Sequence, residues 1–535
     1  MGGNILGILN GKAIEQPLDS TPNRNTLVVG GPGSFKTQSY VITNVLNQTE
    51  TSIVVTDPKG EVFEQTAAIK ELQGFEVHVV NFDMMNASDR YNPIDYVRKD
   101  TEATTVATKI VSANNADGKK DVWYLSQRQF LKALILYAVH ELEPQKQNMR
   151  GILEFFQSFS VEPNKKGESE LGRQFEALPF EHPARKAWDL GVKKAKGEML
   201  GSIVMSLLST ISDYVDAEVA EFTSFSDFHL TDIGNKKIAL YVIIPTMDNA
   251  WEGLINLFFS QMFQELYKFA SLHHAKLPQP VTFYLDEFVN LGKFDSYEEF
   301  LATCRGYGIG VSTIIQTITQ LQDKYNEKKA ESIIGNCAVK IFLDAANHTT
   351  AKYVSDMLDK TTVRVETESS TKQHGKEQNS SSVSDGENYS ARSLMTPGEV
   401  ERMPADTAIV FMKNRHPVKV KKAKQFQLFP GATEYNLRNQ SQYKSNPSKA
   451  QIDDFEERER KFFETISDKE MAKAERLKMQ FDTEQSEAEK EQNEKLADFF
   501  GVEEMSVEEI DSQNTVDISK DKLGTDDKGS FELDL

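Results

Sequence analysis

The residues best suited to chemistry form a glycine-rich turn that ends in lysine and threonine. The turn reads Gly30, Gly31, Pro32, Gly33, Ser34, Phe35, Lys36, Thr37. Backbone N–H groups of such a turn, with the positive end of a following helix, bind the phosphates of a nucleotide. Lys36 would reach the terminal phosphates, and the hydroxyl of Thr37 would bind Mg2+. The pattern therefore predicts a phosphate-binding loop.

One position departs from the usual pattern G-x-x-x-x-G-K-[ST], which has glycine where this chain has Phe35. Pro32 and Gly33 keep the turn able to bend, and Lys36 and Thr37 are intact. We interpret the stretch as a variant phosphate-binding loop. The alternative is an ordinary turn between a core strand and a helix, with Lys36 in solvent.

A second stretch pairs an apolar run, 281–285, with the acids Asp286 and Glu287. Beside a phosphate-binding loop this is typical of a Walker B segment. Asp286 would hold Mg2+, directly or through water, and Glu287 would orient or deprotonate an attacking water. Alone, a strand that ends in two acids is usually a solvated turn. Lys36 and Thr37 upstream favour the chemical interpretation.

A third stretch runs from Cys304 through the strand-like 311–315 to Gln316. Gln316 would end a central strand, where it could sense the γ-phosphate. Arg305 could reach the nucleotide of a neighbouring subunit as an arginine finger. The alternatives are a surface salt bridge for Arg305 and an ordinary hydrogen-bonded amide for Gln316.

The elements that must position these residues are short apolar runs, each followed by turn or helix residues. They lie at 26–29, 53–56, 77–80, 238–244, 281–285, 311–315, 339–343 and 407–412. Near-continuous apolar runs are typical of parallel strands buried on both faces. Helical periodicity separates several of them, as at 251–269. The pattern predicts an α/β fold with a doubly wound, mostly parallel sheet.

Four stretches do not fit this alternation. Residues 1–25 are expected to be a short lead-in, and about 101–222 a mostly helical domain inserted into the α/β domain. Residues 366–392 are polar and serine-rich, which predicts a flexible excursion. From about 436 the chain is polar, with a marginal helix expected within 453–500 and acidic disorder over 502–535.

Composition limits the class of protein. The chain has 535 residues, which suits two to four domains, and its two cysteines fit a reducing cytosol. The net charge is −20, and residues 451–535, with 27 acidic and 12 basic residues, carry −15 of it. A global basic surface for nucleic acid is thereby excluded, so DNA would contact a local surface or an assembled channel. No apolar run of 18 residues or signal peptide is present.

Taken together, these motifs resemble the type IV coupling proteins, the TraG/TraD-type ATPases of bacterial conjugation. The resemblance covers roughly residues 25–430, and 426–430 resembles the close of this domain in Gram-positive members. The stretches that carry it occur in one order: 30–37, 56–61, 91–93, 285–288, 305–309, Gln316, and Gln320 with Leu321.

The resemblance implies a RecA-like nucleotide-binding domain in two parts, 1–101 and 223–435, with an inserted all-α domain at 102–222. Composition adds an acidic tail at 436–535. It also implies that ATP and Mg2+ are bound by 30–37, Asp286 and Gln316, and that Lys36, Glu287 and Arg305 act in hydrolysis between subunits of a hexamer. Substrate recognition is assigned to 102–222, where basic side chains could contact DNA or the relaxase: Lys193, Lys194, Lys196, Arg185 and Lys186. The alternative is an ordinary solvated face.

The partners implied are a relaxase bound to single-stranded DNA and the proteins of a type IV secretion channel. Most family members begin with membrane helices. The sequence shows no such helix. We therefore expect a cytoplasmic protein at the inner face of the cell membrane, held there by a separate small membrane protein, unless a membrane segment has been trimmed. Phe35 bears on the rate of hydrolysis more than on binding. The alternative function is a nucleotide-binding receptor or scaffold with little hydrolysis.

Overall fold

The structure is a computed structural model that describes most of the chain. The described residues are 2–19, 22–113, 120–161, 169–193, 195, 198–245, 251–294, 296–374, 379–432, 437–467 and 471, with the backbone alone at 365–374 and 379–388. Residues 1–459 form one compact unit, and a second unit begins at Arg460.

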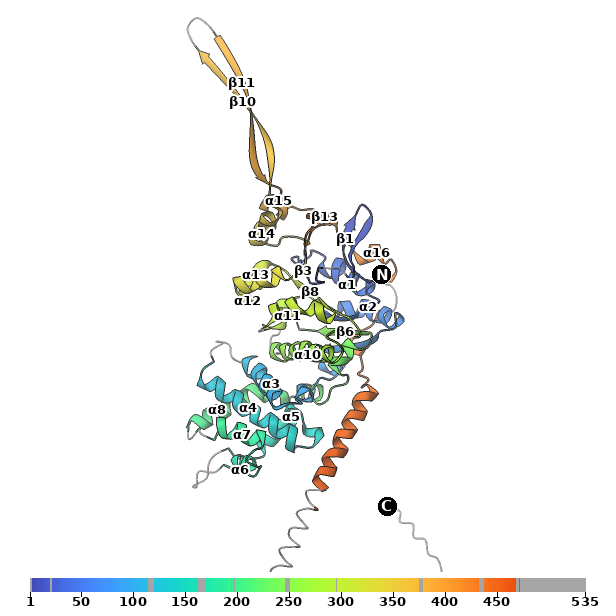
Figure 1. Ribbon diagram of the computed structural model, residues 1–535, viewed down its shortest axis with the longest axis vertical. Coiled ribbons are helices and arrows are strands. Elements are labelled where there is room, and N and C mark those ends of the chain that lie inside the picture. The colour runs from blue at the N-terminus through green and yellow to red at the C-terminus, as the bar shows by residue number, and fades with distance from the viewer. Residues whose placement is uncertain are drawn as a thin grey trace, which may run out of the picture. The chain divides into compact units, whose positions relative to one another are not determined.

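One large sheet organises the compact unit (Figure 1). Its strands are β1 (Asn4–Leu9), β2 (Lys12–Gln16), β3 (Thr26–Val29), β4 (Ser52–Asp57), β5 (Glu76–Asn81), β6 (Ile238–Ile243), β7 (Val281–Leu285), β8 (Ile309–Ile315), β9 (Val339–Phe342), β12 (Thr407–Met412) and β13 (Val418–Lys421). Within the described residues these eleven strands pair in the order β2-β1-β13-β12-β9-β3-β8-β7-β4-β6-β5.

The strands from β9 to β5 in this order are parallel, as the apolar runs predict. Beyond β9, the strands β12, β13, β1 and β2 add on antiparallel. The phosphate-binding loop follows β3, and the Asp286–Glu287 pair follows β7. Only β8 lies between these two strands, so the two motifs begin close together. The expectation of an α/β fold with a mostly parallel sheet is confirmed.

Both faces of the sheet are covered because successive side chains point to opposite faces. Leu27 and Val29 pack toward one core, and Val28 packs toward the other. The second core is closed by α1 (Ile42–Asn47) and α2 (Glu61–Leu72). The first is closed by α10 (Glu252–Leu272), α11 (Tyr297–Thr303), α12 (Ile318–Tyr325), α13 (Glu327–Gly335) and α14 (His348–Leu358).

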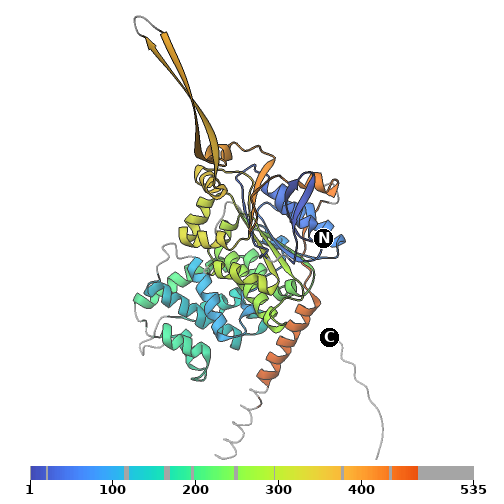
Figure 2. The same ribbon diagram turned by 45° about the horizontal axis from the view of Figure 1, so that its top comes forward.

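A helical segment lies between β5 and β6. Its helices are α3 (Asp100–Ala113), α4 (Val122–Glu141), α5 (Met149–Gln157), α6 (Glu170–Glu176), α7 (Pro183–Gly191), α8 (Glu198–Ile211) and α9 (Ala217–Phe222), and its described residues form no strand. The segment packs on α10 through α3 (Figure 2). A Cβ at Gly253 would lie 2.1 Å from that of Ala113, so glycine permits this close approach. The boundaries 102–222 of a separate domain stay a prediction.

Two stretches form regular structure that the sequence did not predict. The expected lead-in instead forms a hairpin, in which β1 pairs with β2 across Asn10 and Gly11 and β1 joins the sheet edge at β13. The described residues of the expected excursion at 366–392 instead lie in two paired antiparallel strands, β10 (Lys360–His374) and β11 (Asn379–Ser393). They form their own two-stranded sheet beside α14 and α15 (Pro397–Glu401) (Figure 2).

The compact unit extends to Glu459, beyond the expected start of the tail at residue 436. After β13 it contains α16 (Gln425–Leu428), and a further helix spans 449–467. The expected disorder at 502–535 lies outside the described residues. In the part of the chain that the structure describes, no helix is both long and apolar enough to cross a lipid bilayer.

Candidate nucleotide-binding site

A cavity of about 510 Å3 opens at the carboxyl ends of the central parallel strands, the edge at which open α/β sheets bind ligands. The loops after β3, β4, β7 and β8 meet there. The lining residues are Gly31, Pro32, Gly33, Ser34, Phe35, Lys36, Thr37, Gln38, Asp57, Pro58, Lys59, Glu61, Asp286, Glu287, Asn290 and Gln316. Most of the predicted site residues therefore surround one space.

Lys36, Glu287 and Gln316 form a connected group in this cavity. Nζ of Lys36 lies 3.0 Å from Oε1 of Glu287, and Nε2 of Gln316 donates to Oε2 of the same carboxylate at 3.0 Å. Lys36 is 8% exposed and Glu287 19%, so the pair is little screened by water. Glu287 has a φ of +49°, an uncommon left-handed conformation that clusters at functional sites. The structure thus holds the predicted catalytic acid between the lysine and the predicted sensor.

The two predicted Mg2+ ligands are also brought together. Oγ1 of Thr37 donates to Oδ2 of Asp286 at 3.3 Å. Burial raises the pKa of Asp286 to about 6, although the positive charge of Lys36 opposes the shift. A hydroxyl and a buried carboxylate that face each other are oxygen ligands of the kind Mg2+ binds, together with phosphates and water. These residues fit the metal that the motif implies.

The phosphate-binding loop shows why its pattern calls for glycine at position 35. Phe35 has a φ of +64°, the left-handed region that glycine adopts at no steric cost. Phe35 is 40% exposed as a residue, and Nζ of Lys424 lies 4.3 Å from its ring centroid. The loop therefore keeps a glycine-like backbone with phenylalanine in place.

Three polar residues that support the site were not predicted as site residues. Lys422 donates to the carbonyl oxygen of Ser34 at 2.9 Å, and Asp344 accepts from the N–H of Gly31 at 2.7 Å. Burial raises the pKa of Asp57 to about 7. The backbone N–H of Phe63, which donates to Asp57 at 2.8 Å, opposes this rise. Asp57 is the last residue of β4 and directly follows the apolar run 53–56, so its place at the end of a strand could be read from the sequence. Lys422 and Asp344 carry no comparable local signal.

The structure does not bring Arg305 into this cavity. Arg305 lies in a short 3-10 helix, η8 (Cys304–Tyr307), is exposed, and is absent from the described cavity lining.

The basic residues of the helical segment are engaged locally where the structure describes them. Lys193 pairs with Glu176 at 2.8 Å, and Lys186 pairs with Glu181. Arg185 donates to the carbonyl oxygen of Leu178. Lys194 and Lys196 lie outside the described residues.

The fold and the cavity define a RecA-like P-loop protein. A family model described as type IV secretory system conjugative DNA transfer matches residues 10–493. The chain belongs to this family, which confirms the resemblance found in the motifs.

Over the aligned stretches, about a quarter of the residues are identical between this chain and curated relatives. Protein VirD4 of Rhizobium radiobacter is 25% identical over 416 residues, which cover 75% of this chain and 57% of VirD4. A conjugal transfer protein TraG of Escherichia coli is 27% identical over 376 residues, which cover 66% of this chain and 58% of TraG. The chain therefore spans less than three fifths of these relatives' length.

Solved structures support the fold. The unbound conjugative coupling protein TrwBdeltaN70 has a TM-score of 0.55 at 17% identity, covering 78% of this chain and 87% of that chain. The plasmid coupling protein TrwB in complex with ADP and Mg2+ has a TM-score of 0.54 at 18% identity, covering 77% and 87%.

Proposed function

We propose that this chain is a coupling ATPase of conjugative DNA transfer. It would bind ATP with Mg2+ in the cavity, hydrolyse it, and so link relaxase-bound single-stranded DNA to a type IV secretion channel. The observation that carries the proposal is the convergence of Lys36, Thr37, Asp286 and Glu287 in one cavity of a chain of this family.

Each of these residues has a role that its position supports. The N–H groups of the loop and Lys36 would hold the phosphates, and Thr37 and Asp286 would hold Mg2+, which neutralises phosphate charge when bound. Glu287 loses its lysine partner if Lys36 turns to a phosphate. Its carboxylate is then free to accept the proton of an attacking water. Gln316, bonded to the same carboxylate, would register that change.

The partners belong to the same proposal. We propose a hexamer in which the exposed Arg305 acts on a neighbour's nucleotide. We also propose a location at the inner face of the cell membrane, beside channel proteins and a separate small membrane protein. Mixing Arg305→Ala chains with Lys36→Ala chains tests the hexamer: subunits with complementary defects should recover part of the turnover. Mixtures as inactive as either variant alone would contradict action between subunits.

Glu287→Gln tests the catalytic assignment. The amide keeps the shape of the side chain but cannot take a proton, so the variant should bind ATP and turn it over at least about a hundredfold more slowly. Turnover unchanged by Glu287→Gln would overturn the assignment.

The receptor or scaffold alternative rests on Phe35, which occupies the glycine position of the loop. It predicts nucleotide binding with negligible hydrolysis by the wild type, even when DNA and membrane partners are present.

A further inference from the structure

The last residues of the compact unit, 437–459, contact several of its earlier elements. We call residues 437–459 the C-terminal strap. The strap makes contacts, mostly polar, with the loop after β4, with α2, and with both points at which the helical segment joins the sheet.

The first contact lies at the edge of the nucleotide cavity. Nε2 of Gln440 donates to the carbonyl oxygen of Lys59 at 3.1 Å, and Lys59 lines the cavity. The next residue, Gly60, has a φ of +73°, and a Cβ there would lie 2.4 Å from the Gln440 amide. Gln440 therefore packs directly against the 57–61 loop, which lies between the cavity and the strap. Beside it, the N–H of Arg438 donates to the carbonyl oxygen of Glu64 at 3.0 Å.

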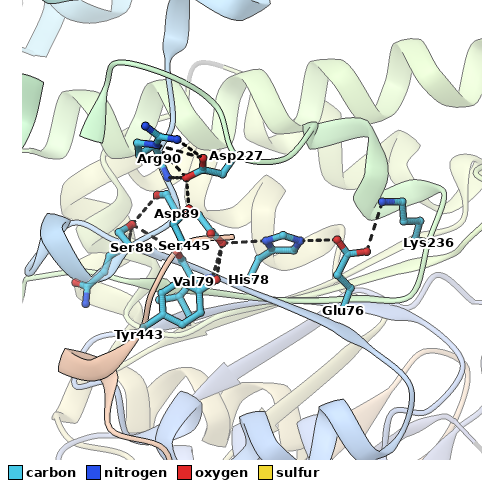
Figure 3. A network of polar contacts seen from close by, with 11 residues as sticks. Glu76, His78, Val79, Ser88, Asp89, Arg90, Asp227, Lys236, Tyr443 and Ser445 are labelled. Carbon is cyan, nitrogen blue, oxygen red and sulfur yellow. Dashed lines mark hydrogen bonds and ion pairs between the residues drawn. The ribbon is translucent and has the colours of Figure 1, made fainter. Parts of the chain in front are cut away.

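The second contact joins the strap to a buried network (Figure 3). The hydroxyl of Tyr443 donates to Oδ2 of Asp89 at 2.8 Å, and Nδ1 of His78 lies 2.9 Å from the same oxygen. Nε2 of His78 lies 3.1 Å from Glu76. Burial alone would lower the pKa of His78, but the two carboxylates raise it to about 9. Tyr443 thus binds a carboxylate that a charged imidazole already orients.

The third contact spans the two connections of the helical segment (Figure 3). The hydroxyl of Ser445 donates to Oδ2 of Asp227, and the N–H of Ser448 donates to the backbone carbonyl oxygen of Asp227 at 2.8 Å. Asp227 itself pairs with Arg90 at 2.9 Å. Arg90 precedes the helical segment and Asp227 follows it, so the strap binds where both connections meet. Farther along the strap, Arg458 pairs with Asp95 at 3.2 Å.

We infer that the C-terminal strap positions the 57–61 loop of the nucleotide cavity, and thereby couples nucleotide binding to the base of the helical segment. Gln440 is the positioning residue. The inference rests on the proposed nucleotide site. Linkage then requires reciprocity: if the docked strap tightens nucleotide binding by some factor, bound nucleotide must hold the strap down by the same factor.

The test compares two glutamines of one segment in the full-length chain. Gln440→Ala removes the bond to the 57–61 loop, and Gln442→Ala, at an exposed position two residues on, is the matched control. Binding of N-methylanthraniloyl-ADP with Mg2+ needs no hydrolysis. We expect Gln440→Ala to weaken it about three- to tenfold, the range of one hydrogen bond, and Gln442→Ala to leave it unchanged.

Trypsin cleavage at the exposed Lys444 reads the reciprocal effect. ADP with Mg2+ should slow cleavage of the wild type by a similar factor and should not slow it in Gln440→Ala. Tyr443→Phe loses one hydroxyl of the strap and should be cleaved faster than the wild type. If Gln440 only stabilised the strap, Gln440→Ala would be cleaved faster than the wild type by the same factor with and without ADP.

Two outcomes would overturn the inference and are distinguishable from failure of the proposed function. Equal ADP affinity in the Gln440 and Gln442 variants, or strap cleavage that ignores ADP in the wild type, removes the coupling while the nucleotide site stands. Binding of the probe that is undetectable in the wild type, or unaffected by Lys36→Ala, removes the nucleotide site and the inference with it.

Discussion

Replacing Phe35 by glycine and by alanine separates the backbone conformation of the phosphate-binding loop from the contacts of its ring. At a φ of +64° an L-residue costs about 1–2 kcal/mol that glycine does not. Glycine in turn loses about 0.5–1 kcal/mol more backbone entropy on folding. The balance makes Phe35→Gly more stable than Phe35→Ala by about 0.5–1 kcal/mol.

The ring contributes a separate amount of similar size. Lys424 lies 4.3 Å from the ring centroid, and cation–π contacts at exposed sites are worth about 0.5–1 kcal/mol. Phe35→Ala loses this contact and keeps the strained backbone, so it should be less stable than the wild type by about that amount. Phe35→Gly loses the contact but also the strain, and should lie near the wild type.

Urea unfolding of the full-length chain, followed by far-ultraviolet circular dichroism, measures the order of stabilities. We expect wild type and Phe35→Gly to be close, with Phe35→Ala below both. An alanine variant as stable as the glycine variant would refute the left-handed conformation assigned to position 35. The same measurement on Ser34→Ala, at a neighbouring position of ordinary φ, gives the effect of substitution without a left-handed backbone.

Two further predictions concern charged groups. Lys36→Ala should destabilise the nucleotide-free chain by about 1–3 kcal/mol because it leaves the Glu287 carboxylate without its cation, and adding Glu287→Gln should recover part of that loss. Urea midpoints of the single and double variants measure both effects, and a double variant no more stable than Lys36→Ala would contradict the prediction. For His78, the folded pKa of about 9 exceeds the ordinary 6.5, so the folded chain holds a proton that the unfolded chain releases. The stability it contributes should be complete below pH 6.5 and lost as the pH rises through about 9; urea midpoints across this range should fall more for the wild type than for His78→Gln, and equal falls would count against the buried imidazolium.

The parallel strands were predictable because they are apolar on both faces. β3 and β7 coincide with the runs 26–29 and 281–285. The antiparallel β12 likewise coincides with the run 407–412, because it is buried almost throughout. The hairpin of β1 and β2 was not predicted, because β2 is mostly exposed and a polar edge strand lacks a continuous apolar run. β10 and β11 were not predicted either, because they form in a polar, serine-rich stretch that has no apolar run.

The candidate site divides in the same way. Lys36, Thr37, Asp286 and Glu287 were predictable because their motifs sit at strand ends, and parallel strands bring those ends together. Contacts that single polar residues make with residues far away in the sequence were not predictable. Tyr443 donates to Asp89, 354 positions earlier, and no periodicity marks either residue. Such contacts depend on the folded path of the backbone.

Steady-state ATP hydrolysis by the wild type and Lys36→Ala, each with and without single-stranded DNA, tests the central claim most directly. We expect turnover by the wild type, stimulation by DNA, and loss of turnover in Lys36→Ala, whose alanine cannot hold the terminal phosphates. Turnover that persists in Lys36→Ala would contradict the site. Binding of ATP by a wild type that does not hydrolyse it, with DNA and membrane partners present, would contradict the proposed ATPase and favour the receptor or scaffold alternative.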